Sequence, residues 1–273
     1  MKKRLVIWYS HGAASLTAAK IAIDTYKGDR EIVVANIFLE NEVKEPELIV
    51  WAEKFLGMKI TILKDTNFEA NVDEVIKRTR YMSGVNGARC TLELKKRVRK
   101  EWQRFDDKHV FGMDINECNR IDRIIDAEPE IDLWAPLIDY KLTKKHCFEY
   151  LNNVEGFTLP LMYRLGYHNN NCKGCVKAAG AGYWNKIRID FPDVFKTRSN
   201  QEKLLGTALC VMSKNDLKKY GDDIIAMMNF EGHPVKRTYD GRLRVPLRFL
   251  PTEAGTFKDM NFGSCGILCE VKD

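Results

Sequence analysis

The sequence lacks three features that would each place it in a special class of protein. It contains no run of about 18 or more apolar residues, so no membrane-spanning helix is expected. It shows no internal repeat, which argues against a solenoid, and no low-complexity linker, which argues against loosely joined modules. Its basic start is followed by only five apolar residues, Leu5 to Tyr9, which read as a buried strand and not as an export signal. The cytoplasm is therefore the expected compartment.

Length, charge and composition are those of an ordinary folded protein. The 273 residues suffice for one large α/β domain, or for one domain with a substantial appendage. Hydrophobic residues make up 45% of the chain, and basic residues outnumber acidic ones by 44 to 38, a net charge of +6. A mildly basic chain suits an anionic partner such as a nucleotide or nucleic acid, although solubility alone accounts for the charge equally well.

Short apolar runs alternate with helical patterns in the first part of the chain. We expect strands at 5–9, 32–38, 59–63 and 110–111, and helices at 16–26 and 46–55. Strands and helices that alternate at this spacing predict βαβ units with right-handed crossovers. The expected fold class is α/β, a three-layer parallel sheet of Rossmann-like type with a Cys-rich helical extension at the C-terminal end.

The pattern weakens after the fourth predicted strand. We expect a mostly helical, basic stretch at 71–104, a turn-like segment at 134–139, and a helix capped by Thr143 that runs to about Leu151. From Gly166 onward the chain is rich in Cys, Gly and aromatic residues. The predicted organisation is a nucleotide-binding domain at 1–160 and a Cys-rich region at 161–273 that packs on it, with a soft boundary.

A polar loop between the first strand and the first helix is a candidate phosphate site. Its residues are Ser10, His11, Gly12, Ala13, Ala14 and Ser15. The amide groups at a helix N-terminus point outward and favour an anion, and Gly12 allows close approach of a phosphate. Segments 39–42 and 112–117 follow other strands of the predicted sheet, so the three segments can converge on one site. The same loop also fits a simple capped turn.

Five blocks in order resemble the PP-loop adenine-nucleotide α-hydrolase-like superfamily, which includes phosphoadenylylsulfate (PAPS) reductases and DNA phosphorothioation sulfurtransferases. They span about residues 5 to 202 and lie at 10–15, 88–95, 112–120, 134–139 and 172–195. The loop departs from the usual Ser-Gly-Gly-x-Asp-Ser at two places, where His11 stands for Gly and Ala14 for Asp. Asp114 stands where Arg is usual. The missing loop Asp weakens the case for ATP-dependent adenylation.

The resemblance implies a set of nucleotide-binding residues: Ser10, His11, Gly12, Ala13, Ala14, Ser15, Asn36, Gly112, Arg89 and Lys95. His11 is either a phosphate ligand or a neutral spacer, since its ordinary pKa permits both. Arg120 can clamp phosphate or sulfate by paired hydrogen bonds, and Glu117 can hold a metal or hold Arg120 in place. We assign Arg120 and Glu117, together with Cys269, as the catalytic residues.

Eight cysteines in a chain expected in the cytosol do not suggest a disulfide framework. We expect Cys118, Cys147 and Cys210 to be small buried hydrophobic residues. Cys172 and Cys175 have the spacing of metal ligands, which a redox dithiol shares.

The resemblance adds two further positions to that pair, Cys90 and the C-terminal tail. It favours a 4Fe-4S cluster over zinc, with ligands Cys90, Cys172, Cys175 and Cys265 and with Cys269 as the free, reactive thiol. The assignment of Cys265 and Cys269 can be exchanged.

Three functions remain open at this point. The first is an ATP-using PP-loop enzyme that adenylates its substrate, with Mg²⁺ to offset phosphate charge, and transfers sulfur at an iron-sulfur centre. The second is a PAPS or adenylylsulfate reductase in which a tail thiolate attacks sulfur and thioredoxin recycles it. The third is a non-catalytic protein that binds a nucleotide or nucleic acid. A sulfur donor and a second copy of the chain, as a homodimer, are further expected partners.

Overall fold

The computed structural model describes residues 3–84 and 87–260 and divides into two compact units. The described residues of the first unit are 3–71 and 91–166. Those of the second unit are 72–84, 87–90 and 167–260. Within the described residues, no helix combines the length and the apolar character that a bilayer crossing requires.

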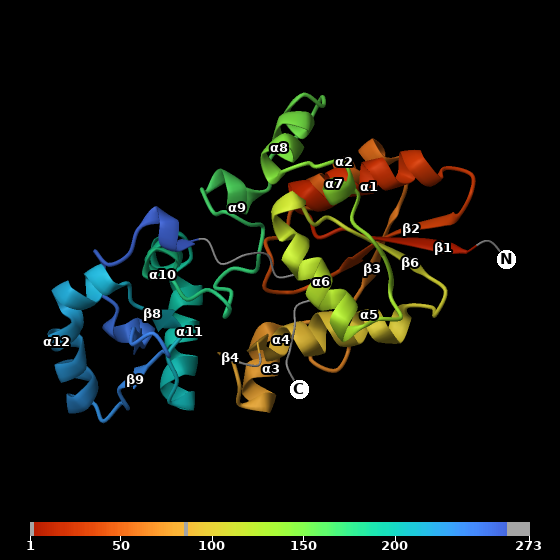
Figure 1. Ribbon diagram of the computed structural model, residues 1–273. Helices are drawn as coiled ribbons and strands as arrows, with labels where there is room; N and C mark the ends of the chain where they lie inside the picture. The colour runs from red at the N-terminus through yellow and green to blue at the C-terminus, as the bar shows by residue number, and fades with distance from the viewer. Residues whose placement is uncertain (1–2, 85–86, 261–273) are drawn as a thin grey trace. The chain divides into compact units, whose positions relative to one another are not determined.

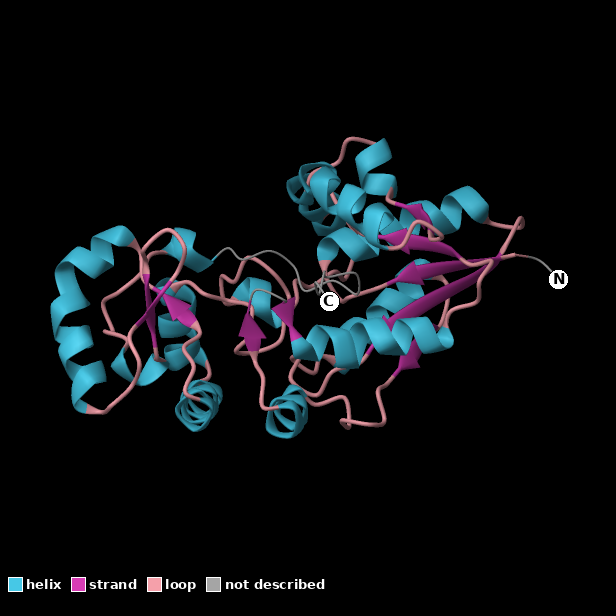
Figure 2. Cartoon of the chain, turned by 60° about the horizontal axis from the view of Figure 1, so that its bottom comes forward, coloured by secondary structure: helices cyan, strands magenta, loops and turns pink. Residues whose placement is uncertain are grey.

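The first unit is built on a five-stranded sheet with the order β3-β2-β1-β6-β7. All four strand pairings are parallel, which confirms the α/β fold class. The strands are β1 (Arg4–Trp8), β2 (Glu31–Ile37), β3 (Ile60–Leu63), β6 (Lys108–Phe111) and β7 (Asp132–Trp134). Figure 2 shows these strands with helices on both sides of them.

The strand order reverses direction next to β1. The chain moves outward from β1 through β2 to β3, and then returns to place β6 on the other side of β1. Ligands of such sheets bind beyond the carboxyl ends of the strands at this reversal. The residues that follow β1 and β6 are therefore the ones best placed to form a site.

Alternate residues of β1, and Tyr9 directly after it, pack on opposite faces of the sheet. Leu5, Ile7 and Tyr9 belong to one buried cluster with α1, whereas Val6 and Trp8 belong to another with residues of α5 and α6. Figure 1 shows α1 on one side of the sheet and α5 on the other. A strand buried on both faces must be apolar throughout, which is why β1 could be predicted from its composition.

The helices of the first unit have the following bounds: α1 (Ala13–Tyr26), α2 (Pro46–Leu56), α5 (Arg97–Trp102), α6 (Cys118–Ala127), α7 (Pro136–Asp139), α8 (Lys144–Asn152) and α9 (Leu161–Arg164). Helix α2 has Pro46 in its first turn and ends at Gly57, whose φ of 66° is left-handed, as predicted. Thr143 caps α8 by accepting a hydrogen bond from the backbone N–H of His146.

The stretch at 71–104 is mostly helical, as predicted, but two short paired strands interrupt it. Helix α3 (Val72–Thr79) is followed by a hairpin of β4 (Ser83–Gly84) and β5 (Gly87–Ala88). Gly87 adopts a φ of 81°, which breaks a helix. The helix resumes as α4 (Arg89–Thr91) and passes through the π-helical turn η1 (Leu92–Lys96) before α5. Strand β7 was also missed, because its three residues are too few to show a period.

The second unit is mainly helical. Its longer helices are α10 (Ala181–Asp190), α11 (Pro192–Leu205) and α12 (Lys214–Phe230). A small antiparallel sheet has the order β8-β10-β9, made of β8 (Cys210–Val211), β9 (Lys236–Arg237) and β10 (Leu243–Val245). Two 3₁₀ turns, η3 (Leu247–Phe249) and η4 (Phe257–Met260), complete it. Gly182, at the start of α10, packs closely against the backbone of Thr256. A Cβ there would lie 2.2 Å from the carbonyl oxygen of Thr256, so a larger residue would clash.

Acid should destabilise the first unit through His109 in β6. The Nδ1 atom of His109 accepts a hydrogen bond from Trp8 Nε1 at 3.0 Å, an arrangement that requires this nitrogen to be unprotonated. Burial, assisted by the nearby Arg99, lowers the pKa of His109 to about 4. The unfolded chain binds a proton near the ordinary histidine pKa, so stability is lost as pH falls from about 6.5 toward 4.

The loss should reach up to about 3 kcal/mol at the acid end of this range. Urea unfolding followed by tryptophan fluorescence at several pH values would measure it. The His109→Gln variant should flatten the pH profile, because glutamine takes up no proton in this range. An identical acid slope in wild type and His109→Gln would contradict this assignment.

Candidate functional site

One hydroxyl group closes the loop between β1 and α1. Ser15 Oγ accepts hydrogen bonds from the backbone N–H of Ser10, at 3.1 Å, and from the Ser10 hydroxyl, at 3.2 Å. It donates to the carbonyl oxygen of Gly12 at 2.9 Å. Gly12 precedes α1, and no described side chain caps the helix there. The first-turn amide groups of α1 therefore suit an anion, with Ser10 as the exposed hydroxyl beside them.

Gly112 allows the end of β6 to touch this loop. A Cβ atom on Gly112 would lie 2.4 Å from Ser15 Cα, 2.5 Å from Ser15 N and 2.8 Å from the carbonyl carbon of Ala14. All three atoms belong to the backbone, so only a residue without a side chain fits. The ends of β1 and β6, which are adjacent at the reversal of strand order, thus meet directly at the loop.

His11 occupies a strained position in the loop. Its φ is 59°, in the left-handed region that costs an ordinary residue about 1–2 kcal/mol. A glycine at this position would avoid that cost. The ring packs edge-on against Tyr9, with 5.0 Å between centroids. Burial lowers the pKa of His11 below the ordinary value, and Glu42 opposes that shift.

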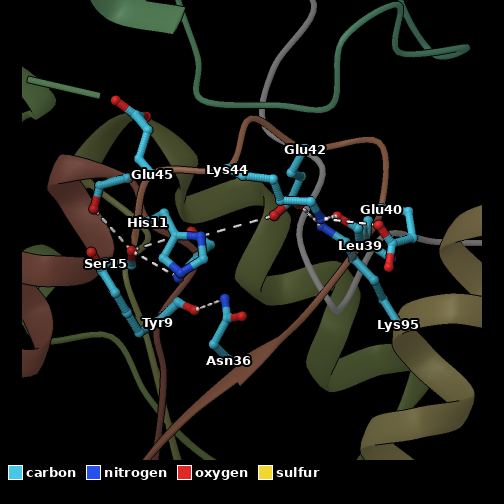
Figure 3. A network of polar contacts seen from close by, with 12 residues as sticks. Tyr9, His11, Ser15, Asn36, Leu39, Glu40, Glu42, Lys44, Glu45 and Lys95 are labelled. Atoms are coloured by element: carbon cyan, nitrogen blue, oxygen red, sulfur yellow. Dashed lines mark hydrogen bonds and ion pairs between the residues drawn. The ribbon is translucent and has the colours of Figure 1, made fainter. Parts of the chain in front are cut away.

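A carboxylate links His11 to a buried lysine, as Figure 3 shows. Glu42 Oε2 lies 3.9 Å from His11 Nδ1, and Glu42 Oε1 lies 3.4 Å from Lys95 Nζ. The three side chains come from the loop after β1, the loop after β2 and η1, and each is at most 16% exposed. Segment 39–42 and the phosphate loop therefore do converge beyond the carboxyl ends of the strands.

Two more side chains border the loop. Asn36, 2% exposed in β2, donates through Nδ2 to the carbonyl oxygen of Tyr9 at 2.8 Å, and no described group bonds its buried Oδ1. The Tyr163 hydroxyl lies 3.4 Å from where a Cβ on Gly12 would be. Ala14 is partly buried and packs against the core cluster on the α1 face.

Segment 114–120 is organised by carboxylates. Asp114 accepts hydrogen bonds from the backbone N–H groups of Asn116, at 2.9 Å, and Lys144, at 2.8 Å. Its role at the place of the usual Arg is thus to cap the turn η2 (Ile115–Glu117) and to tie it to α8. Arg120 Nη1 donates to Glu117 Oε1 at 2.8 Å. Glu117 thus contacts Arg120, while both roles predicted for it, in holding Arg120 or a metal, stay predictions.

Lys144 is a cation near these groups that the sequence did not reveal. Its Nζ lies 5.0 Å from the centre of the Tyr163 ring. Burial lowers the pKa of Lys144, and the nearby Glu117 and Asp114 oppose the shift. Tyr163 in turn borders the loop at Gly12. Only the position of Lys144 next to a predicted helix cap, Thr143, could have drawn attention to it.

Predicted residues outside this cluster fall into two groups. Arg89 is exposed at the start of α4 and belongs to the second unit. Cys265 and Cys269 lie outside the described residues. Cys147 and Cys210 are buried as predicted, whereas Cys118 is only half-buried and donates to the carbonyl oxygen of Ile115.

Cys172 and Cys175 lie in a braced turn of the second unit. Both thiols are buried, and Gly174 between them has a left-handed φ of 62°. The backbone N–H of Cys175 donates to the Tyr183 hydroxyl at 2.8 Å. Burial, with the adjacent Cys175 and Cys172 sulfur atoms, raises the pKa of Tyr183 far above its ordinary value. The Tyr183 phenol thus stays neutral beside the two cysteines.

Residues distant in sequence hold this turn in place. Ser83 Oγ, in β4 of the hairpin that precedes Cys90, donates to the carbonyl oxygen of Val176 at 2.6 Å. Arg198 donates through Nε to the carbonyl oxygen of Gly174 at 2.9 Å and pairs through Nη1 with Asp73. The sequence offered no signal for Arg198, because a lone arginine in a helix is usually solvated.

The cysteine turn fits a thiolate-bound metal or cluster in part. Two buried thiols three residues apart, beside a neutral phenol and braced backbone, can supply two of four ligands. Within residues 3–84 and 87–260, no three His, Cys, Asp or Glu side chains gather closely enough to hold a metal ion. A four-cysteine site therefore needs Cys90 to approach the pair and a tail cysteine beyond the described residues.

Replacement of Arg198 by Met should destabilise the second unit by about 1–3 kcal/mol, because the Gly174 carbonyl and the Asp73 carboxylate lose a buried donor. Thermal unfolding would measure the loss. The control is Arg237→Met, since Arg237 is exposed and bonds only locally, to Gly241. Equal melting temperatures for the two variants would show that Arg198 does not brace the turn.

Comparisons with known proteins add little to this geometry. No protein-family model matches the chain, and no curated protein matches it. A solved structure similar to it is the U34-tRNA thiolase NcsA from Methanococcus maripaludis with its 4Fe-4S cluster. The two share 12% sequence identity over 74% of this chain and 72% of the other, with a TM-score of 0.33. At that score the likeness assigns neither a cluster nor a tRNA substrate to this chain.

Proposed function

We propose that the chain is a PP-loop enzyme that binds ATP, adenylates its substrate and transfers sulfur at a cysteine-ligated iron-sulfur centre. The observation that carries the nucleotide part is the loop Ser10–Ser15. It follows β1 at the reversal of strand order, leads into the N-terminus of α1, and is pressed against β6 at Gly112. Helix N-termini at this position of a parallel sheet are built for phosphate.

The residues around the loop have distinct roles in this proposal. The first-turn amides of α1 and the Ser10 hydroxyl contact phosphate oxygens, while Lys95 and Lys144 supply positive charge. An oxygen of the acceptor attacks the α-phosphorus, the bond from that phosphorus to pyrophosphate breaks, and the acceptor carries AMP. A sulfur nucleophile then displaces AMP. Mg²⁺ bound together with ATP would offset the charge of the leaving pyrophosphate, and Glu117 would orient Arg120 toward phosphate.

The cysteine centre is the second half of the proposal. Cys172 and Cys175, with Cys90 and either Cys265 or Cys269, would hold a 4Fe-4S cluster, with zinc as the alternative occupant. When bound, such a cluster supplies a site for sulfur. The Gly174 turn and Tyr183 set the spacing of the first two thiols. The proposal includes a sulfur donor and a sulfur acceptor, and nucleic acid is one class of acceptor that it allows.

A PAPS or adenylylsulfate reductase is the second candidate. It is favoured by Ala14 in place of the loop Asp, which leaves the loop without a carboxylate. In that case a tail thiolate, from Cys269 or Cys265, attacks the sulfur of the bound sulfonucleotide. The bond from that sulfur to the phosphate oxygen breaks, the nucleotide leaves, and the cysteine carries the sulfo group. Sulfite is then released when thioredoxin reduces the enzyme.

Anaerobically purified protein distinguishes these functions. Release of AMP and pyrophosphate from ATP that depends on magnesium, when a cell extract is added to supply the sulfur acceptor, supports the proposed adenylating enzyme. Sulfite release from a sulfonucleotide with thioredoxin overturns it in favour of the reductase. If neither ATP nor a sulfonucleotide raises the melting temperature, the loop is not a nucleotide site, because a ligand of the native state must stabilise it.

A further inference from the structure

The contact between Glu42, His11 and Lys95 places a carboxylate where the proposed nucleotide needs positive charge. Glu42 lies within 3.9 Å of a nitrogen of the phosphate loop's own histidine and within 3.4 Å of Lys95. Lys95 and His11 both belong to the predicted nucleotide-binding residues, both can carry a positive charge, and both lie next to Glu42. A phosphate bound between them would meet the Glu42 carboxylate as a like charge.

We infer that Glu42 is an internal competitor of nucleotide phosphate, one that occupies His11 and Lys95 and must leave them when the nucleotide binds. This inference rests on the proposed nucleotide site and adds to it a residue that sets affinity. A buried lysine requires a partner, and Glu42 provides it until a more highly charged phosphate group replaces it.

The surroundings of His11 make the exchange sensitive to pH. The charged groups that face the ring are Glu42 and Glu45 on the acidic side and Lys95 and Lys44 on the basic side, and Tyr9 packs against it. Burial holds the pKa of His11 below its ordinary value. A phosphate at the ring raises that pKa, so binding takes up a proton. Nucleotide affinity should therefore fall as pH rises between about 5 and 8.

Glu42→Gln tests the competitor directly. Isothermal titration of the full chain with ATP and with inorganic tripolyphosphate should show affinity roughly tenfold higher than wild type, because the repelling charge is removed at close range. Adenosine, which lacks phosphate, should bind equally to both proteins. The matched control is Glu40→Gln in the same loop. This substitution removes the same net charge, but Glu40 pairs with Lys44 and Lys64 and not with His11 or Lys95.

His11→Asn and His11→Gly test the pH dependence. Both residues tolerate the left-handed φ of position 11, and neither titrates. We expect these variants to fold and to lose the share of the pH dependence that His11 contributes, so that ATP affinity changes less between about pH 5 and 8 than in wild type; the part that remains comes from the ionisation of the ATP phosphate itself. A variant that keeps the wild-type pH profile would remove His11 from the exchange.

The outcomes separate this inference from the proposed function. Weaker ATP binding by Glu42→Gln, or a gain equal to that of Glu40→Gln, overturns the competitor while the nucleotide site stands. A gain for adenosine equal to the gain for ATP also overturns it, because the effect would then not involve phosphate. If wild type binds none of ATP, tripolyphosphate and adenosine, the proposed function and the inference fail together.

Discussion

Gly112→Ala should abolish high-affinity nucleotide binding while most of the protein stays folded. The new methyl group would lie 2.4 Å from Ser15 Cα and 2.5 Å from Ser15 N, so the backbone of the loop must move. Such overpacking costs about 1–3 kcal/mol in stability. Because the displaced atoms belong to the first turn of α1, we expect ATP affinity to fall by at least about tenfold.

Gly12→Ala is the matched control for this prediction. Gly12 has an ordinary extended backbone, with φ of −93°, and the nearest atom that a Cβ there would meet is the Tyr163 hydroxyl oxygen at 3.4 Å, an ordinary van der Waals distance. Its melting temperature should therefore stay near that of wild type, unlike that of Gly112→Ala. Circular dichroism and titration with ATP would measure both quantities. Unchanged ATP binding by Gly112→Ala would show that the loop beside β6 is not the nucleotide site.

Cys175→Ser should remove the metal centre. The thiol is buried in a turn fixed by Tyr183 and Arg198, so no other described sulfur can easily take its position. Loss of one of four thiolates usually costs most of the metal affinity, and we expect iron to fall below about a tenth of the wild-type content. Iron and sulfide analysis, with the absorbance of the anaerobic protein in the visible range, would measure this.

The control for the metal prediction is Cys210→Ala. Cys210 lies in the same unit, and burial raises the pKa of its thiol, so it is a poor ligand. This variant should keep the wild-type iron content. Zinc without iron in the wild-type protein would rule out the cluster but leave a metal site. Full iron content in Cys175→Ser would exclude the cysteine turn from any such centre.

The sheet could be predicted from sequence because each of its long strands carries its own signal. Leu5 to Tyr9 is apolar throughout, as a strand covered on both faces must be, and Pro46 and Gly57 mark the ends of α2. The short elements were missed or misplaced. The β4–β5 hairpin lies inside a stretch whose composition favours a helix, and the left-handed backbone of Arg80 and Gly87 interrupts the helix there.

The site was predictable in outline and not in its contacts. Loop position follows from strand order, so segments 10–15, 39–42 and 112–117 could be expected at one edge of the sheet. That Glu42 lies between His11 and Lys95 depends on side-chain direction in a loop and in a π-helical turn, which no local pattern encodes. The pairing of Arg198 with Asp73, 125 positions away, is likewise a product of tertiary packing.

The π-helical turn η1 has a consequence for insertions and deletions in this chain. The backbone N–H of Arg97 bonds to the carbonyl oxygen of Leu92, so this turn holds one residue more than an α-helical turn. Removal of one residue would rotate everything before it by about 100° relative to α5. Lys95 could then no longer reach Glu42 while Arg99 keeps its buried pairing with Glu128. The additional residue thus allows one continuous helix to make two contacts at once: the buried pair of Arg99 with Glu128, and the contact of Lys95 with Glu42 at the candidate site.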